Sequence, residues 1–467
     1  MKNVALHNLG CKVNSYEIEV MQQKLTENGY SIVPFAPGAD IYIINTCTVT
    51  NIADRKSRQM LHKAKKMNPD AVVVAVGCYV QTGSEVVKQD ACIDLAIGNN
   101  RKKDIVEILE QFLKERENSA KAQDKTLQDT TIVDINHTDE YEEMQLYQTA
   151  EHTRAYIKIQ DGCNQFCSYC IIPYARGRVR SRKPEDILTE IRALVANGYK
   201  EVVVTGIHLS SYGLDFLKKE TGDYLEGLGD IREAVYKKGF LLKLLEDMQQ
   251  VEGLERIRLG SLEPRIITEH FAKRLSELSK VCPHFHLSLQ SGCDNVLKRM
   301  NRHYTAKEYF EKVQILRKYY EHPAITTDII TGFPQETEEE FAETVDFVKR
   351  VNFYETHVFR YSKRQGTPAA KMDGQLTDAV KAARSDVLLE LAKKNGRAFR
   401  ELFVGETIEV LLEEQKEING RLYMLGHTKE YVQAAIETDA DMANELVSAK
   451  AVGFLKEDIL LLNFSNR

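Results

Sequence analysis

Short apolar segments alternate with helical segments along residues 1–115, and this alternation restricts the fold more than any other feature of the sequence. The apolar segments are NVALHN, IYIIN, AVVVAV and IDLAI, and residues with helical spacing follow them. Strands that alternate with helices in this way build a parallel sheet with helices on both faces. The sequence therefore predicts a doubly wound α/β domain at the N-terminus.

A second alternation runs from residue 151 to about residue 375. Its six predicted strands are 154–160, 201–207, 256–261, 284–290, 324–331 and 356–362. Six such units predict an incomplete parallel barrel with active residues at the carboxyl ends of its strands. Residues 116–150 are polar and aperiodic, which predicts a linker between the two regions. The charged segment 214–240 interrupts the barrel pattern and is expected to be a surface insertion.

The chain changes character after the barrel. A connecting helix is expected over 376–400, with the basic side chains Lys381, Arg384, Lys393, Lys394, Arg397 and Arg400. Residues 401–467 contain five short strand-like segments, which predict a small β-barrel. The predicted fold class is α/β, with three parts: a doubly wound domain, an incomplete barrel and a small C-terminal β-barrel.

Composition indicates the class of the protein and the compartment in which we expect it. The chain has 467 residues, of which 43% are hydrophobic and 28% charged, as in ordinary globular proteins. No run approaches the roughly 18 apolar residues of a membrane helix, and the N-terminus lacks the apolar core of a signal peptide. We therefore expect a cytoplasmic protein with no membrane partner. In that compartment nine cysteines indicate metal or redox chemistry more than structural disulfides.

Three cysteines follow the first predicted barrel strand in the stretch DGCNQFCSYC. Cys163, Cys167 and Cys170 have C-x3-C-x2-C spacing, with no fourth cysteine or closely following histidine. Thiolates suit iron–sulfur clusters, which usually take four of them, so three ligands would leave one iron open. A catalytic zinc with three protein ligands and a water, or three loop cysteines by chance, remain alternatives.

A second trio lies in the N-terminal domain. Cys11, Cys47 and Cys78 come just after the first three predicted strands. The carboxyl ends of parallel strands open onto one edge of a sheet, so these residues can converge into a shared ligand set. The alternative is that each is a small core residue. The other cysteines are assigned to core or loop positions: Cys92, Cys282 and Cys293.

A basic run, RGRVRSRK, follows the loop that contains Cys163, Cys167 and Cys170. Its cations are Arg176, Arg178, Arg180, Arg182 and Lys183. Arginine pairs bidentately with phosphate or carboxylate, so this run is predicted to bind the substrate or RNA at the barrel mouth. With KRMNRHY (298–304) and the basic helix it would form an RNA path, although the net charge of the chain is −6. The alternative is an ordinary solvated face.

The pattern C-x3-C-x-aromatic-C, with Tyr169 as the aromatic residue, resembles the signature of radical S-adenosylmethionine enzymes. The resemblance implies an incomplete (β/α)6 barrel and a 4Fe–4S cluster whose open iron binds S-adenosylmethionine, the source of a 5′-deoxyadenosyl radical. It also implies that Tyr169 flanks the adenine and that polar strand ends line the site. The cofactor-binding residues expected on this basis are Tyr169, Thr205, Gly206, Ser261, Glu263, Ser288 and Gln290.

The three predicted parts together resemble the methylthiotransferases over essentially the whole chain. In that family the N-terminal trio holds an auxiliary 4Fe–4S cluster that carries the sulfur to be inserted, and the C-terminal barrel resembles a TRAM domain, an RNA-binding module. The resemblance therefore implies two 4Fe–4S clusters and S-adenosylmethionine as cofactors. It names neither the electron donor nor the sulfur source.

Within that family, CNQFCSYCIIPYARGRVRSR is most similar to the enzymes for N6-threonylcarbamoyladenosine, next to the anticodon in the tRNA anticodon stem-loop. The threonylcarbamoyl group carries a carboxylate, which arginines can neutralise, and Arg178 and Arg180 are predicted to do so. Isopentenyladenosine in tRNA and an aspartate of a ribosomal protein remain alternative substrates. A non-catalytic iron–sulfur regulator that binds RNA is a further alternative.

Overall fold

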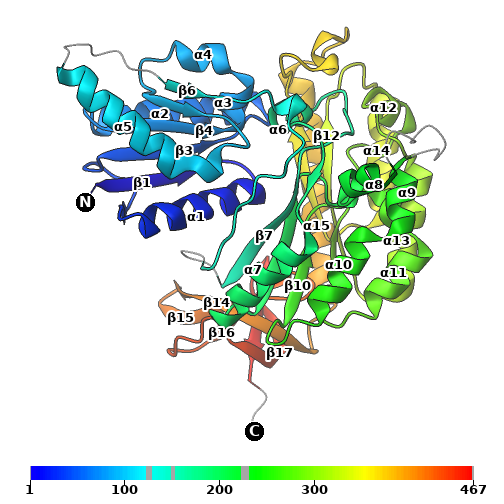
Figure 1. Ribbon diagram of the computed structural model, residues 1–467. Coiled ribbons are helices and arrows are strands. Elements are labelled where there is room, and N and C mark those ends of the chain that lie inside the picture. The colour runs from blue at the N-terminus through cyan, green and yellow to red at the C-terminus, as the bar shows by residue number, and fades with distance from the viewer. Residues whose placement is uncertain (1, 122–128, 149–152, 222–230, 465–467) are drawn as a thin grey trace.

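The N-terminal lobe is built on a six-stranded parallel sheet (Figure 1). The computed structural model describes residues 2–121, 129–148, 153–221 and 231–464. The strand order is β2-β1-β3-β4-β5-β6. The strands are β1 Asn3–Asn8, β2 Ser31–Val33, β3 Ile41–Thr46, β4 Val72–Gly77, β5 Leu95–Ile97 and β6 Asp129–Thr131. The predicted α/β domain is confirmed, and β6 extends its sheet into the segment predicted as a linker.

Helices cover both faces of this sheet. They are α1 Lys12–Glu27, α2 Asn51–Met67, α3 Cys78–Thr82, α4 Ser84–Lys88 and α5 Ile105–Lys121. Side chains of a strand alternate between faces. Ile41 and Ile43 of β3 accordingly join the core that includes α1 and α5, whereas Tyr42 and Ile44 join the core that includes α2. Both faces are thus buried, which explains why β4 and the first four residues of β3 are apolar.

The central lobe is an incomplete parallel barrel. Its strands are β7 Arg154–Asp161, β8 Arg180–Ser181, β9 Glu201–Gly206, β10 Arg256–Leu259, β11 His284–His286, β12 Ala324–Thr331 and β13 Glu355–Arg360. The sheets β10-β9-β7-β8 and β11-β12-β13 are joined by parallel bridges, Ile257 with Val281 and Leu262 with Leu287. The short β8 pairs with β7 antiparallel. The six predicted strands are confirmed, each within one residue of its predicted start.

Helices pack outside this barrel. They are α6 Ile172–Arg176, α7 Pro184–Ala196, α8 Leu214–Thr221, α9 Ile231–Lys238, α10 Phe240–Gln249, α11 Glu269–Ser276, α12 Asp294–Arg299, α13 Ala306–Tyr319 and α14 Glu338–Val351. Residues 222–230 of the predicted insertion lie outside the described residues. Its described ends pack inward, because Leu214, Leu217 and Val235 are buried together with Val179. These parts of the insertion are therefore integral to the lobe.

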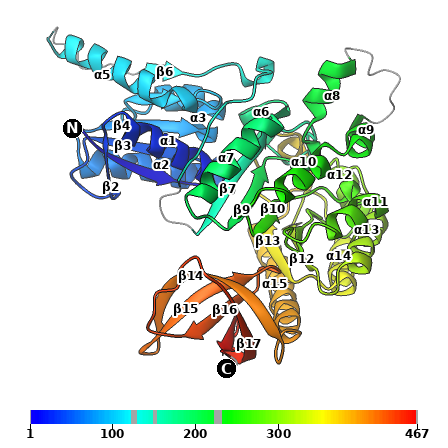
Figure 2. The same ribbon diagram turned by 60° about the horizontal axis from the view of Figure 1, so that its bottom comes forward.

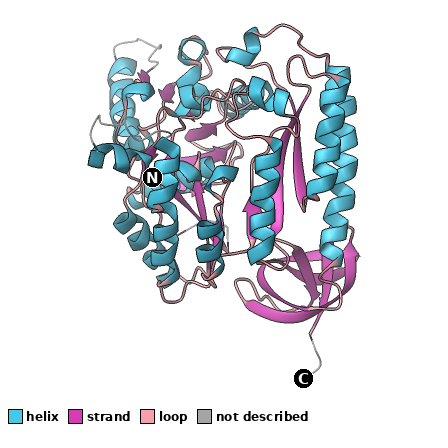
Figure 3. Cartoon of the chain, turned by 90° about the vertical axis from the view of Figure 1, so that its right-hand side faces the viewer, coloured by secondary structure: helices cyan, strands magenta, loops and turns pink. Residues whose placement is uncertain are grey.

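The C-terminal lobe is a closed five-stranded barrel, as predicted. It follows the long helix α15 Asp378–Glu401 and comprises β14 Thr407–Ile418, β15 Arg421–Thr428, β16 Gln433–Glu437, β17 Leu446–Lys456 and β18 Ile459–Asn463. Figures 2 and 3 show this barrel at one end of the molecule. It contacts the amino-terminal end of the central barrel, where buried Arg258 donates to Glu201 (2.7 Å) and to the carbonyl of Lys429 (2.8 Å). The C-terminal barrel thus lies away from the carboxyl ends of the central barrel strands, where the site is predicted.

The basic side chains of α15 are paired with acids of this chain, and RNA contact by this helix stays a prediction. Arg384 donates to Glu336 and to Glu338, each at 2.6 Å. Lys393 pairs with Glu457 at 2.9 Å. These cations are neutralised by acids of this chain, which the sequence pattern could not reveal. None of the described helices is long and apolar enough to cross a membrane.

Candidate functional site

The loop with Cys163, Cys167 and Cys170 lies between β7 and α6, at the carboxyl end of the first barrel strand. Backbone hydrogen bonds hold it in place: the amide of Cys163 donates to the carbonyl of Gly177 (3.0 Å), and that of Ser168 to the carbonyl of Met300 (3.0 Å). Burial raises the pKa of the Cys170 thiol, and the neighbouring Cys167 and Cys163 raise it further. The three thiols therefore lie close enough to interact.

A cation contacts this trio. Arg302 donates from Nη1 to the sulfur of Cys167 at 3.2 Å, and from Nη2 to the carbonyl of Ser288 at 3.3 Å. Sequence reasoning placed this arginine only within a basic stretch for RNA. Arg302 lies 135 positions from Cys167, so no local signal could have paired them.

Gly162 makes the tight turn into the cysteine loop. Its φ is +72°, and a Cβ added there would overlap the carbonyl oxygen of Arg178. We expect Gly162→Ala to displace the loop and to lower the iron content of the reconstituted protein by about four atoms, one cluster. Gly198→Ala is the matched control, because Gly198 has φ +95° and open space around it. It should cost only backbone strain, about 1–2 kcal/mol. Iron assays and unfolding curves check both; equal iron content would contradict the expectation.

The second trio converges at the edge of the N-terminal sheet. Cys11 precedes α1, Cys47 follows β3 and Cys78 begins α3, so all three lie at the carboxyl ends of adjacent strands. A Cβ on Gly10 would lie 3.1 Å from the sulfur of Cys47. Burial raises the pKa of Cys47 to about 11, and Cys78 and Cys11 contribute to that rise. The structure brings together the three residues predicted to share a ligand.

Helix α6 lies between the two trios. Its last residue, the fully buried Arg176, donates to Glu17 (2.8 Å), Asn14 (2.7 Å) and Asp161 (3.1 Å). Asn99 donates to the carbonyl of Ala175 at 2.7 Å and to the sulfur of Cys78 at 3.5 Å. The segment that follows Cys170 is thus bonded to residues beside both Cys11 and Cys78.

The predicted RNA contacts of the basic run are wrong for three arginines. Arg176 and Arg182 are 0% exposed and Arg180 is 1% exposed. Arg182 pairs with the buried Glu190, and Arg180 faces Asp161 at 3.9 Å. These side chains are internal ion-pair partners, since acids distant in sequence meet them inside the fold.

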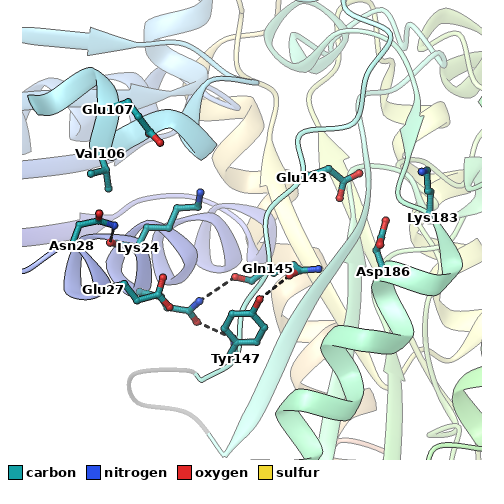
Figure 4. Close-up of a pocket in the computed structure, with 11 residues that line it drawn as sticks. Lys24, Glu27, Asn28, Val106, Glu107, Glu143, Gln145, Tyr147, Lys183 and Asp186 are labelled. Atoms are coloured by element: carbon teal, nitrogen blue, oxygen red, sulfur yellow. Dashed lines mark hydrogen bonds between the residues drawn. The ribbon is translucent and has the colours of Figure 1, made fainter. Parts of the chain in front are cut away.

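Arg178 and Lys183 stay accessible. Arg178 is half-buried, with its guanidinium 4.5 Å from the centre of the Phe166 ring. Lys183 is exposed at a cleft of about 570 Å³ between α1, α5 and α7 (Figure 4). The charged residues that line this cleft are Lys24, Lys183, Glu27, Glu107, Glu143 and Asp186. Four acids against two lysines repel a polyanion, and no neighbour in sequence of a trio cysteine lines the cleft, so we do not place the site there.

The expected cofactor residues lie at the carboxyl ends of barrel strands. Thr205 and Gly206 end β9, Ser261 and Glu263 follow β10, and Ser288 and Gln290 follow β11. Ser261 is exposed, whereas Glu263 is buried.

The Glu263 carboxylate is held by two partners. It accepts bonds from Arg265 and from the Tyr236 hydroxyl, each at 2.7 Å. Burial alone would raise its pKa, but the charges of Arg265 and His208 outweigh burial and lower it. An ionised buried carboxylate is a suitable neighbour for a cationic sulfonium or ammonium group. Tyr236 comes from α9, so the predicted surface insertion reaches the site.

A cavity of about 220 Å³ is lined by residues that lie next to one cysteine of each trio. Val49 and Thr50, just after Cys47, form one side of it, and Tyr169, just before Cys170, lies on another. The remaining lining residues are Gln290, Asp328, Ile330, Phe359, Arg360, Tyr361 and Ser362. Val49 is 51% exposed and Phe359 49% exposed, so apolar surface is open at the rim. The cavity can take a planar group and place it between the two cysteine loops.

The donor set fits iron–sulfur clusters better than zinc. Thiolates that share one zinc at about 2.3 Å lie roughly 3.8 Å from one another. In the described part of the chain, His62–Asp90–Cys92 and His286–Asp328–His357 are the groups of possible ligands within 4.8 Å of one another, and neither trio is among them. Wider spacing suits a cluster of several irons.

Comparisons with known proteins agree with this site. Residues 157–348 match the model of the Radical SAM superfamily, and residues 3–98 that of Uncharacterized protein family UPF0004. The chain is 38% identical to the threonylcarbamoyladenosine tRNA methylthiotransferase MtaB of Bacillus subtilis, over 96% of this chain and 94% of that protein. It is 37% identical to MtaB of Aquifex aeolicus, over 89% and 94% of the two chains.

Other relatives are more distant. The chain is 33% identical to the tRNA-2-methylthio-N(6)-dimethylallyladenosine synthase of Acetivibrio thermocellus, over 96% of this chain and 88% of that protein. Among solved structures, the radical S-adenosylmethionine methyltransferase TsrM of Kitasatospora setae shares the fold, with a TM-score of 0.54 and 14% identity over 79% of this chain and 75% of that one. Near full-length identity above 30% establishes the family: this chain is a member of the radical S-adenosylmethionine tRNA methylthiotransferases.

Proposed function

We propose that this enzyme methylthiolates N6-threonylcarbamoyladenosine next to the anticodon of tRNA. The product is the 2-methylthio derivative. The observation that carries the proposal is the cavity whose wall includes both Val49–Thr50, after Cys47, and Tyr169, before Cys170. A base in this cavity lies beside both cysteine loops, where a radical source and a sulfur source are both needed.

The two trios have different roles in this proposal. Cys163, Cys167 and Cys170 hold the 4Fe–4S cluster that binds S-adenosylmethionine, and Cys11, Cys47 and Cys78 hold an auxiliary 4Fe–4S cluster. When bound, these groups supply the radical, the sulfur and the methyl group. The protein positions them: Tyr169, Thr205, Gly206, Ser261, Glu263, Ser288 and Gln290 surround the cofactor. Arg302 stabilises the anionic charge at Cys167.

Accessible arginines favour the threonylcarbamoyl group over an apolar isopentenyl group. Arg360 is exposed and lines the cavity, and Arg178 lies near the loop with a buried guanidinium nitrogen, Nη1, that has no hydrogen-bond partner among the described residues. Either can pair with the substrate carboxylate. The relatives at 38% and 37% identity are named for threonylcarbamoyladenosine, and the one at 33% for dimethylallyladenosine. Dimethylallyladenosine, the modified base called isopentenyladenosine above, is therefore the second candidate substrate.

The remaining parts serve RNA binding in this proposal. The C-terminal barrel acts as a TRAM-like module that binds tRNA outside the anticodon loop. The exposed Phe359 offers an aromatic face for base stacking at the cavity rim, as RNA recognition of splayed bases requires, and the exposed Val49 offers an apolar contact. The proposed domain limits are residues 1–115, 151–375 and 401–467, with the helix 376–400 and the connecting segment 116–150 between them, from which β6 joins the N-terminal sheet.

A strain in which the gene for this enzyme is deleted tests this proposal. In the proposal, the enzyme modifies tRNA in the cytoplasm. We expect tRNA of the deletion strain to lose 2-methylthio-N6-threonylcarbamoyladenosine, to accumulate the unmethylthiolated nucleoside, and to recover on complementation. Nucleoside mass spectrometry measures both. Loss of 2-methylthio-isopentenyladenosine in its place would assign the second candidate substrate.

A further inference from the structure

Three potential metal ligands lie on three neighbouring barrel strands. His286 is on β11, Asp328 on β12 and His357 on β13. In the parallel register His286 pairs with Thr326, and Asp328 pairs with His357. Because side chains alternate along a strand, these three ligands share one face of the sheet.

That face is the inside of the barrel. Asp328 lines the 220 Å³ cavity. The intervening residues Phe285, Leu287 and Ile329 belong to the core beneath the outer helices. The three ligands therefore lie on the inner face of the sheet. His286 and Asp328 are partly buried there, and His357 is exposed to solvent.

The ligand atoms are already close together. One atom from each residue lies within 4.8 Å of the other two. Nε2 of His286 is 3.2 Å from Oδ2 of Asp328, and the two imidazole rings are stacked with centroids 5.8 Å apart. Nδ1 of His286 is 3.0 Å from the Thr326 hydroxyl. Such an outer partner orients a histidine ligand and leaves the other ring nitrogen for a metal.

We propose that His286, Asp328 and His357 bind a divalent first-row transition metal ion. Two imidazoles and one carboxylate on one face are a ligand set that holds such ions and leaves coordination positions open. The open positions face the cavity, so the ion can take an oxygen ligand from whatever occupies it. This site uses none of the cluster cysteines and goes beyond the proposed function.

The chain offers a built-in control. His62, Asp90 and Cys92 also meet within 4.8 Å, but the His62 side chain is 54% exposed and the group includes a thiol. Soft thiolates favour zinc, whereas nitrogen and oxygen ligands accept Mn²⁺. Mn²⁺ therefore distinguishes the two groups.

The test measures Mn²⁺ binding to the cluster-loaded enzyme. Binding is monitored through the EPR signal of the Mn²⁺ that stays free in solution. We expect one saturable site per chain, with affinity reduced at least about tenfold by His357→Ala, which removes a ligand, and by Asp328→Asn, which removes the ligand's negative charge. Cys92→Ala should leave the affinity unchanged.

Iron content and circular dichroism confirm that each variant is folded. The exposed position of His357 makes its variant the least disruptive. No saturable binding, equal affinity in both ligand variants and the wild type, or loss only in Cys92→Ala would each overturn the proposal.

Discussion

Replacing Cys163, Cys167 and Cys170 together with alanine should leave about four irons per chain where the wild type holds about eight, because one of two 4Fe–4S clusters is lost. Cleavage of S-adenosylmethionine should stop, since the open iron that binds it is gone. Iron and sulfide assays, with quantification of 5′-deoxyadenosine after reduction, measure both effects. Unchanged iron in this variant would show that the assignment of the trio is wrong.

The matching replacement of Cys11, Cys47 and Cys78 should separate the two roles. It should also leave about four irons, but cleavage of S-adenosylmethionine should persist, because the second trio lies in another lobe. Methylthiolated tRNA should be absent. The control is Cys92→Ala with Cys293→Ala, two cysteines outside both trios, which should retain about eight irons. Methylthiolated tRNA from the N-terminal variant would refute the auxiliary cluster.

Arg176→Met should be the most destabilising single substitution among the basic residues near the site. The side chain is fully buried, and its loss removes a partner of the buried Glu17 and Asp161. Breaking a buried ion pair by removing one member costs about 3–5 kcal/mol. Because Arg176 joins α6 to α1, we also expect the variant to take up less iron at both trios.

Arg178→Met is the matched control. It is the same substitution two residues away, but Arg178 is half-buried and its guanidinium lies over the face of Phe166. A cation–π contact of this kind contributes about 0.5–1 kcal/mol. Denaturant unfolding of the two cluster-loaded variants, with hydrogen exchange of α1 and α6, measures the difference. Equal losses of stability would contradict the bridging role of Arg176.

Local patterns were sufficient for the architecture and for both trios. Hydrophobic periodicity is a property of neighbouring residues, so the barrel strands began where the sequence predicted them. The convergence of Cys11, Cys47 and Cys78 followed from a general rule about parallel sheets. No detailed packing was needed for these predictions.

Long-range pairing explains the errors. The inward turn of Arg180 depends on the antiparallel pairing of β8 with β7, where Arg180 lies opposite Asp161. The partner of Arg176 on α1, Glu17, is 159 positions away. A run of basic letters therefore gives no information about which cations are solvated. Arg302 and Arg360 were missed as site residues for the same reason, since folding alone places them beside Cys167 and the cavity.

The most direct test of the proposed substrate uses two matched tRNA anticodon stem-loops. One carries N6-threonylcarbamoyladenosine and the other isopentenyladenosine, in the same sequence. With reconstituted enzyme, S-adenosylmethionine, a reductant and a sulfide source, nucleoside mass spectrometry should find the 2-methylthio product only on the threonylcarbamoyl stem-loop. Equal product on both stem-loops, or product only on the isopentenyl one, would contradict the account.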